Sequence, residues 1–148
     1  MEKFGFLNIN KPKGMTSHDV IYVLRKVLGI KQIGHSGTLD PMATGLLIIG
    51  YNEGTKLLGD LMLQDKQYQT TIKFGIRTDT GDKTGTIIEK QRVKLNEKQV
   101  KQALASFVDQ DYLQRPHPYS AVKVNGKKAY EYARAGNPLE LEPRLVRI

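Results

Sequence analysis

The sequence predicts a mixed α+β fold, a largely antiparallel sheet with flanking helices, and three observations support this class. Short segments of alternating or continuous apolar residues have the length of strands. Longer segments place apolar residues at helical spacing and begin with capping residues. Glycine and asparagine separate these segments at short intervals, as in turns. With 148 residues, the chain is long enough for one ordinary domain with a core.

The first half of the chain carries the clearest signals. Residues 7–9 alternate and predict a strand, which a turn at residues 11–14 ends. Thr16 or Ser17 then caps a helix, with Asp19 placed as in a capping box. The apolar face of this helix contains Val20, Val23, Leu24, Val27 and Leu28, and Gly29 ends it. The apolar run 46–49 predicts a buried strand, and residues 55–63 predict a weaker helix, which Gly59 disfavours.

The second half alternates between strand and helix signals. Residues 67–74 alternate and predict a half-buried strand, with a partner strand around residues 86–89. Asn96 caps a helix whose apolar positions are Val100, Ala103, Leu104 and Phe107. Residues 121–124 predict a strand that turns at Asn125-Gly126, and residues 127–135 a short helix ended by Gly136. Residues 145–148 predict a terminal strand, so we expect antiparallel strands around one sheet.

The composition favours a protein of a reducing, aqueous compartment. The chain has no cysteine, and its N-terminus lacks the apolar core of a signal peptide. No apolar run reaches the roughly 18 residues that a membrane span needs. We therefore expect a cytoplasmic location without membrane contact. The three histidines are scattered, so the sequence predicts no metal site, and no motif indicates a cofactor.

The net charge of +8 is the feature of the composition that points to a partner. A basic domain of this size commonly binds a polyanion, because each neutralised phosphate releases condensed counterions. The alternative is a protein that is merely basic and soluble. Charge does not choose between RNA and DNA, or between binding and catalysis.

Asp40 is the candidate catalytic residue, in the stretch GHSGTLDPMATGLL at residues 34–47. Pro41 disfavours helical angles at Asp40, and the glycines allow tight turns and close approach to a ligand. The strand that follows would anchor a loop that presents one carboxylate from a rigid support. A solvated aspartate is ionised at neutral pH and needs no base to act as a nucleophile. The alternative is an ordinary Asp-Pro turn between two elements.

The whole stretch resembles the active-site motif of the TruB family of tRNA pseudouridine-55 synthases, approximately GH-x-G-x-LDP-x-ATG-x-L. Three further segments resemble family motifs in the same order. Residues 10–17 read NKPKGMTS, residues 66–85 contain a tyrosine followed by Thr- and Asp-rich sequence, and residues 114–136 read QRPHPYSAVKVNGKKAYEYARAG. The resemblance covers most of this chain.

The resemblance implies a pseudouridine-synthase-like catalytic domain that isomerises uridine to pseudouridine at position 55 in the TΨC loop of tRNA. Asp40 would be the nucleophile on a flipped-out uridine. Tyr68 would stack on the flipped base, which needs a surface to replace its lost stacking. His35 would occupy the space that the uridine leaves. A tyrosine at an alternating strand position is also a common core residue, and a lone loop histidine commonly makes a structural hydrogen bond.

The remaining matches divide into support and RNA contact. Residues expected to support the active site are Pro12, Gly37, Thr38, Leu39, Pro41 and Tyr119. Residues expected to contact RNA are Lys11, Lys123, Lys127, Lys128 and Arg134. Lys11 could equally support the active-site loop, and the alternative for the last three is a solvated helix face.

The chain also departs from the family pattern. His117 stands where a proline is usual, and Asp109 where a glycine is common. Family members add an arginine that pairs with the aspartate, later strands and usually a PUA domain, none of which is matched here. We therefore expect residues 1–148 to be an N-terminal part of the catalytic domain, without a PUA domain. It would be inactive or severely impaired alone, and the intact protein would be a monomeric enzyme that binds the TΨC stem-loop.

Two rival functions remain open. A non-catalytic basic RNA-binding module, such as a tRNA-folding chaperone, would bind RNA without needing the Asp40 carboxylate. A hydrolytic or phosphoryl-transfer enzyme would need a second carboxylate or a metal cluster beside Asp40, and the motif supplies neither. Residues 81–84 lack the spacing of a phosphate-binding loop, and residues 79–85 lack that of a calcium loop.

Overall fold

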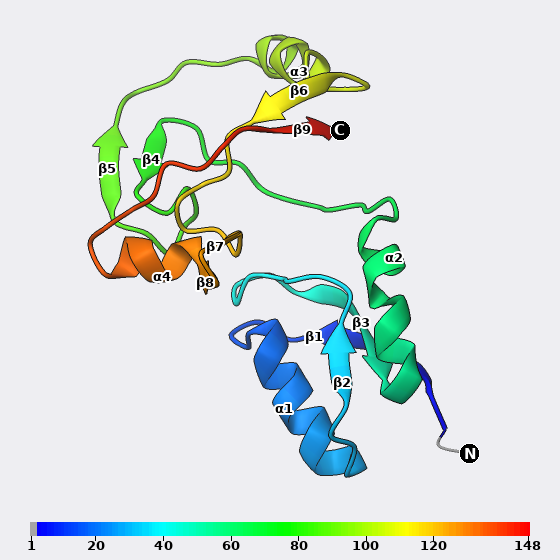
Figure 1. Cartoon of the computed structure of the whole chain (residues 1–148). Helices are drawn as coiled ribbons and strands as arrows, with labels where there is room; N and C mark the ends of the chain where they lie inside the picture. Colours follow the sequence, from blue (N-terminus) through cyan, green and yellow to red (C-terminus); the bar gives the residue numbers. More distant parts are fainter. Residues whose placement is uncertain (1–2) are drawn as a thin grey trace. The chain divides into compact units, whose positions relative to one another are not determined.

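The computed structural model describes residues 3–148 and divides into two compact units (Figure 1). The N-terminal unit ends at Gln69, and the C-terminal unit is Thr70–Ile148. Helices and strands are mixed, and every strand pair is antiparallel, so the predicted α+β class is confirmed. The expectation of one sheet is wrong. Within residues 3–148 the strands form one three-stranded and three two-stranded sheets, because strand pairs form within separate parts of the chain.

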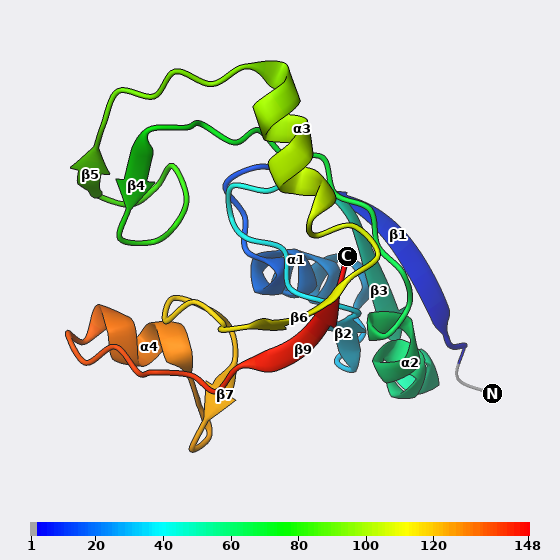
Figure 2. The same ribbon diagram turned by 90° about the horizontal axis from the view of Figure 1, so that it is seen from above.

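The N-terminal unit is built on a three-stranded sheet in the order β1-β3-β2. Its elements are β1 (Gly5–Lys11), α1 (Ser17–Leu28), β2 (Ile33–His35), β3 (Gly45–Tyr51), the 3-10 helix η1 (Asn52–Leu57) and α2 (Leu58–Met62). The central strand β3 pairs with β1 along its whole length and with β2 at its C-terminal end. Helix α1 lies beside β2 and β3 in both views (Figure 1, Figure 2).

Helix α1 has the boundaries that its sequence predicts. Thr16 Oγ1 accepts a hydrogen bond from the Asp19 N–H at 3.0 Å, and the Asp19 carboxylate accepts one from the Thr16 N–H at 2.7 Å. These hydrogen bonds with Thr16 hold the pKa of Asp19 below its usual value. At the other end, Gly29 adopts the left-handed conformation with φ 67°. Of the two candidate caps, Thr16 is therefore the one used.

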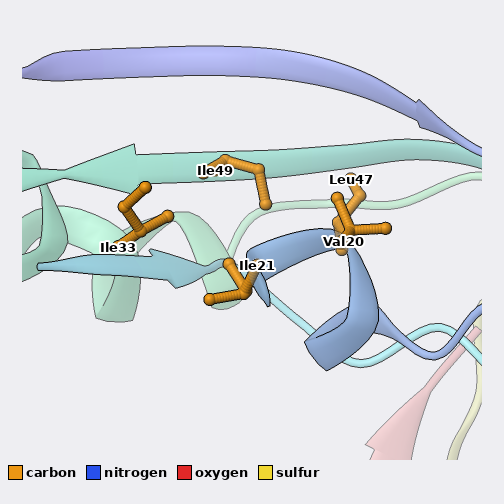
Figure 3. Packing of buried hydrophobic residues seen from close by; sticks show 5 residues of the cluster. All are labelled: Val20, Ile21, Ile33, Leu47 and Ile49. Atoms are coloured by element: carbon orange, nitrogen blue, oxygen red, sulfur yellow. The ribbon is translucent and has the colours of Figure 1, made fainter. Parts of the chain in front are cut away.

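Five buried side chains form the core of the N-terminal unit (Figure 3). They are Val20 and Ile21 from α1, Ile33 from β2, and Leu47 and Ile49 from β3. The alternate residues Leu47 and Ile49 point to the same face of the sheet, whereas Leu46, directly before Leu47, points to the opposite face and is 62% exposed. The predicted strand at 46–49 is confirmed, but only one of its faces is buried in this unit.

The C-terminal unit has three separate two-stranded sheets and two helices. Its elements are β4 (Ile76–Thr78), β5 (Ile87–Lys90), α3 (Glu97–Ala105), β6 (Asp111–Gln114), β7 (Lys123–Val124), β8 (Lys127–Lys128), α4 (Ala129–Arg134) and β9 (Arg144–Arg147). The pairs are β4-β5, β6-β9 and β7-β8. Asn125 and Gly126 have φ 50° and 81°, as a tight hairpin turn requires, so the predicted turn is confirmed.

Several predicted elements differ from the structure. Residues 67–74 form no strand, although apolar and polar residue types alternate in their sequence, and the strand begins at Ile76 instead. Alternation describes the two faces of a strand, but a strand also needs a hydrogen-bonding partner, and only residues 76–78 find one in β5. The predicted helix at 55–63 is split into η1 and α2. The short strands β2 and β6 were not expected, and β6 is the partner that pairs with the predicted terminal strand, β9.

Candidate active site

Asp40 lies in the loop between β2 and β3, at residues 36–44. Both ends of this loop are fixed, because β2 and β3 are antiparallel neighbours and the Ser36 N–H extends their pairing to the Ile48 carbonyl at 2.9 Å. The Asp40 carbonyl accepts the Ala43 N–H at 3.0 Å, which closes a turn with Pro41 at its second position. The Asp40 side chain is exposed at this turn. A rigid base therefore presents one carboxylate to solvent.

The loop between β1 and α1 makes hydrogen bonds to Pro41, the residue after Asp40. The Gly14 N–H donates to the Pro41 carbonyl at 2.7 Å, and Gly14 reaches this position with φ 91°, which favours glycine. The Lys11 ammonium adds a longer contact to the same carbonyl at 3.5 Å. Both loops lie at the same end of the N-terminal unit (Figure 1). Gly14 and Lys11 of the segment NKPKGMTS thus hold the loop that carries Asp40.

Lys11 is fully buried, at 0% exposure. Its Nζ also donates to the Met15 carbonyl at 2.7 Å and to the Pro12 carbonyl at 3.0 Å. A buried ammonium is tolerated when carbonyl oxygens satisfy its donors, as they do here. The expected phosphate contact of Lys11 is therefore wrong for this structure, because the ammonium is enclosed, and the supporting role that the sequence also allowed replaces it.

The residue before Asp40 is held from α1. Ser17 Oγ accepts the Leu39 N–H at 2.9 Å and donates to the Leu39 carbonyl at 3.3 Å. Leu39 also packs against the core of the unit. Asp40 is therefore flanked on both sides by backbone that other parts of the unit hold. Sequence reasoning named Ser17 only as a possible helix cap, and the pairing with Leu39 was missed because the two residues lie 22 positions apart.

The Asp40 carboxylate itself makes no side-chain hydrogen bond or ion pair within residues 3–148. The hydrogen bonds that involve Asp40 are made by its backbone. The same part of the chain holds no group of three or more potential metal ligands. The carboxylate is thus positioned through its neighbours in the chain and is left accessible to a ligand.

The other predicted residues of this loop surround Asp40 in sequence. His35 ends β2, and its Nδ1 accepts the Gly37 N–H at 3.3 Å. This bond leaves the Nε2 atom as the ring nitrogen that carries the proton when the imidazole is neutral. Thr38 and Pro12 are exposed. The structure therefore brings Lys11, Pro12, His35, Gly37, Thr38, Leu39, Asp40 and Pro41 into one unit, at adjoining loops.

Tyr68 is placed differently from its prediction. It lies in the segment after α2 that forms neither helix nor strand, and its side chain is 70% exposed. Among the described residues it makes no hydrogen bond or ring contact. The reading of Tyr68 as a buried strand residue is therefore wrong, and its aromatic face is free to meet a ligand.

A basic cluster, defined as Lys123, Lys127, Lys128 and Arg134, lies on the β7-β8 hairpin and on α4 in the C-terminal unit. The Lys128 Nζ lies 5.5 Å and the Arg134 guanidinium 5.2 Å from the centre of the Tyr130 ring. Lys123 and Lys128 are direct cross-strand partners, an arrangement of like charges that is unfavourable unless an anion lies nearby. The sequence predicted the four basic residues but not Tyr130, whose position one turn before Arg134 was the available signal.

Tyr119 belongs to the C-terminal unit and precedes this hairpin. Its N–H donates to His117 Nδ1 at 3.2 Å, and the two rings lie 5.8 Å apart. Tyr119 and the basic cluster are thus ordered by contacts inside their own unit. None of the helices in residues 3–148 combines the length and the hydropathy needed to cross a membrane.

Comparisons with known proteins agree with the motif at Asp40. Residues 25–148 match the family model described as TruB family pseudouridylate synthase (N terminal domain). A tRNA pseudouridine synthase B of Ureaplasma urealyticum is 47% identical over 140 residues, covering 95% of this chain and 61% of the relative. One of Mesoplasma florum is 44% identical over 149 residues, covering 100% and 52%. The chain therefore spans about half to three fifths of the length of these relatives.

Solved structures share the fold. A Cbf5-Nop10-Gar1 complex contains a chain with a TM-score of 0.55 and 25% identity, covering 81% of this chain and 31% of that chain. An H/ACA RNP bound to a substrate RNA containing 2'-deoxyuridine contains a chain with a TM-score of 0.55 and 24% identity, covering 97% and 45%. The second likeness, at that identity, concerns the fold alone.

Proposed function

Because the chain belongs to the TruB family of pseudouridylate synthases, we propose that it isomerises uridine to pseudouridine at position 55 in the TΨC loop of tRNA. Asp40 is the proposed nucleophile. The observation that carries this proposal is the geometry of the Asp40 loop, in which both neighbouring residues are held by backbone and hydroxyl contacts while the carboxylate is exposed and unpaired within the described chain. Relatives named tRNA pseudouridine synthase B support the choice of substrate.

The proposed reaction exchanges one bond of the base for another. The Asp40 carboxylate attacks the flipped uridine, and the bond between N1 and the ribose C1′ breaks. The base then rotates and bonds to C1′ through C5, and the bond to the Asp40 carboxylate breaks, which regenerates the free carboxylate. The hydrogen of C5 leaves as a proton, and N1 gains one. Oxidation states are balanced and no group is transferred to another molecule, so the proposal requires neither a cofactor nor a metal.

Two further residues are assigned to the uridine in this proposal. Tyr68 stacks on the flipped base, and its exposed ring supports this role. His35 fills the space that the base leaves, and its position at the end of β2, directly before the Asp40 loop, supports that role. Base–aromatic stacking is worth about 1–3 kcal/mol, which offsets much of the cost of unstacking.

The basic cluster is the proposed contact with the RNA backbone. Lys123, Lys127 and Arg134 are exposed, and Lys128 is half-buried beside Tyr130. The net charge of +8 supports a polyanionic partner. Pro12, Gly37, Thr38, Leu39, Pro41 and the buried Lys11 are proposed to support the Asp40 loop, and Tyr119 to support the RNA-facing side of the C-terminal unit.

We also propose that residues 1–148 form the N-terminal part of a catalytic domain. The description of the matching family model and the share of the relatives that the chain spans support this division. The intact enzyme is proposed to act as a monomer in the cytoplasm on the TΨC stem-loop, and the 148-residue chain alone to be severely impaired. Asp40 has no cationic partner within residues 3–148, which supports the last expectation, because a small misplacement of a catalytic group can cost about 100-fold in rate.

The decisive test is tritium release from a TΨC stem-loop labelled at C5 of the target uridine. The full-length protein should release tritium, the Asp40→Asn variant should not, and both should bind the RNA with the same affinity. Asp60→Asn, the same change at an exposed position in α2, is the matched control and should retain the parent rate. Salt-dependent RNA binding without tritium release from any variant would instead identify a non-catalytic RNA-binding protein.

A further inference from the structure

We propose that Ser17 is a positioning residue for Asp40, acting through the backbone of Leu39. This inference rests on the proposed function. Ser17 is the first residue of α1 and is 2% exposed. Its hydroxyl makes both hydrogen bonds that the Leu39 peptide groups offer, accepting from the N–H at 2.9 Å and donating to the carbonyl at 3.3 Å.

The geometry separates this role from helix capping. The neighbouring Thr16 hydroxyl accepts the Asp19 N–H and makes the N-cap of α1. Ser17 Oγ is engaged with Leu39 instead, so the two adjacent hydroxyls serve different parts of the unit. The two contacts need a group that donates and accepts through one atom, as a hydroxyl does.

The peptide groups that Ser17 holds lie immediately before Asp40. The Leu39 carbonyl belongs to the peptide bond with Asp40, so an anchor at this oxygen fixes the plane from which the Asp40 backbone continues. The Pro41 carbonyl is anchored independently by the Gly14 N–H at 2.7 Å. The residues on both sides of Asp40 are therefore held by hydrogen bonds. Among the residues that the structure describes, Ser17 supplies the only side-chain hydroxyl in these hydrogen bonds.

Removal of the Ser17 hydroxyl should lower catalysis more than it lowers substrate binding. In Ser17→Ala the Leu39 N–H loses its acceptor, and the loop gains freedom where the nucleophile is attached. We expect kcat for tritium release to fall by about 10- to 100-fold, with KM and the affinity for the stem-loop unchanged. Ser17→Thr keeps the hydroxyl and should recover most of the rate, provided that circular dichroism shows it folded.

Thr16→Ala is the matched control, since it removes the adjacent hydroxyl and weakens the same helix without touching Leu39. It should lower the melting temperature measurably and leave kcat at the parent value. Amide exchange at Leu39 gives a readout independent of activity. Ser17→Ala should accelerate this exchange by a larger factor than Thr16→Ala.

The outcomes distinguish the inference from the function on which it rests. A parent rate in Ser17→Ala, an equal loss of kcat in Thr16→Ala, or a folded Ser17→Thr variant as slow as Ser17→Ala would each overturn the positioning role. Absence of tritium release from the parent protein would reject the proposed function and the catalytic part of this inference together. In that case Leu39 exchange would still report whether the hydroxyl holds the loop.

Discussion

The N-terminal and C-terminal units each contain a well-capped helix with apolar residues at helical spacing, but only the helix of the N-terminal unit is packed into a core. Helix α1 and helix α3 both begin with a complete capping box, at Thr16 and at Asn96, and both carry apolar residues at helical spacing. Helix α1 buries Val20 and Ile21, whereas α3 has no buried residue. Capping and periodicity therefore decide whether a helix forms, and the presence of a packing partner decides whether it contributes to a core.

The difference extends to the whole of each unit. The N-terminal unit encloses large aliphatic side chains, among them Ile49 at 0% exposure and Leu47 at 2%. In the C-terminal unit the buried apolar residues are Pro116, Ala129, Ala133 and Leu141, and large side chains such as Leu113 and Leu145 are about two-thirds exposed. The proposed nucleophile is attached to the unit with the core, which suits a group that must be held in place, and the basic cluster belongs to the other.

Truncation of two strand leucines should reveal the largest contrast between the units. Leu47→Ala should destabilise the N-terminal unit by about 2–5 kcal/mol, because it leaves a cavity in the core. Leu113→Ala removes the same atoms from a side chain that is 69% exposed and should change stability by less than about 0.5 kcal/mol. Urea unfolding followed by circular dichroism checks both. Equal losses would show that Leu113 is packed in solution.

Polar contacts, rather than a core, order the loop between β4 and β5. The Asp82 carboxylate accepts hydrogen bonds from the Thr84 N–H, the Thr84 hydroxyl and the Thr80 hydroxyl at 2.6–2.8 Å. Asp82→Ala should lower the free energy of opening of this loop by about 1–3 kcal/mol, since charged acceptors make the stronger hydrogen bonds. Amide exchange at Thr84 measures this opening, and exchange at Ile49 serves as the control in the other unit.

The same loop should respond to acid. Burial alone would raise the pKa of Asp82, but hydrogen bonds from Thr84, Thr80 and the Gly85 backbone more than offset it, so the pKa lies below the usual 3.8. A folded pKa below the unfolded one means that the carboxylate contributes its full stability above about pH 4 and loses it as the pH falls through the lowered value. Asp82→Asn should remove this pH dependence at Thr84. An unchanged acid response in that variant would assign it to another group.

Removal of the two helix caps should lower the stability of each helix by a similar amount, but the effect should spread to more residues from α1 than from α3. Thr16→Ala and Asn96→Ala should each cost about 1 kcal/mol of helix stability. Because α1 packs into the core, the first loss should appear in amide exchange throughout the N-terminal unit. The second should be confined to α3, which buries nothing. Exchange in β4 and β5 that rises along with α3 would contradict this division.

Exposed ion pairs should contribute least to stability, and by a similar amount in both units. Glu97 pairs with Lys101 in α3, and Glu53 pairs with Lys56 in η1, with all four side chains more than half exposed. Glu97→Gln and Glu53→Gln should each change stability by less than about 0.5 kcal/mol. Thermal melts at low and high salt check this, because screening should remove the small difference. A larger, salt-resistant loss would indicate a buried network.

Local interactions explain why much of the fold was predictable. The start and end of α1, the cap of α3 and the hairpin turn at Asn125-Gly126 each depend on residues within a few positions of one another. The strand at residues 67–74 was predicted wrongly because alternation says nothing about a partner. The short strands β2 and β6 were missed for the converse reason, as their pairing with β3 and β9 defines them more than their own residues do.

The sequence by itself determined the family, the position of Asp40 and the residues that surround it in the chain, since these follow from an ordered set of residue types. Only the tertiary structure decided that Lys11 is enclosed by carbonyls, that Tyr68 is exposed, and that Ser17 and not Thr16 meets Leu39. Burial and hydrogen bonding between distant residues depend on how the chain returns on itself, whereas caps, turns and motifs are written within a few consecutive residues.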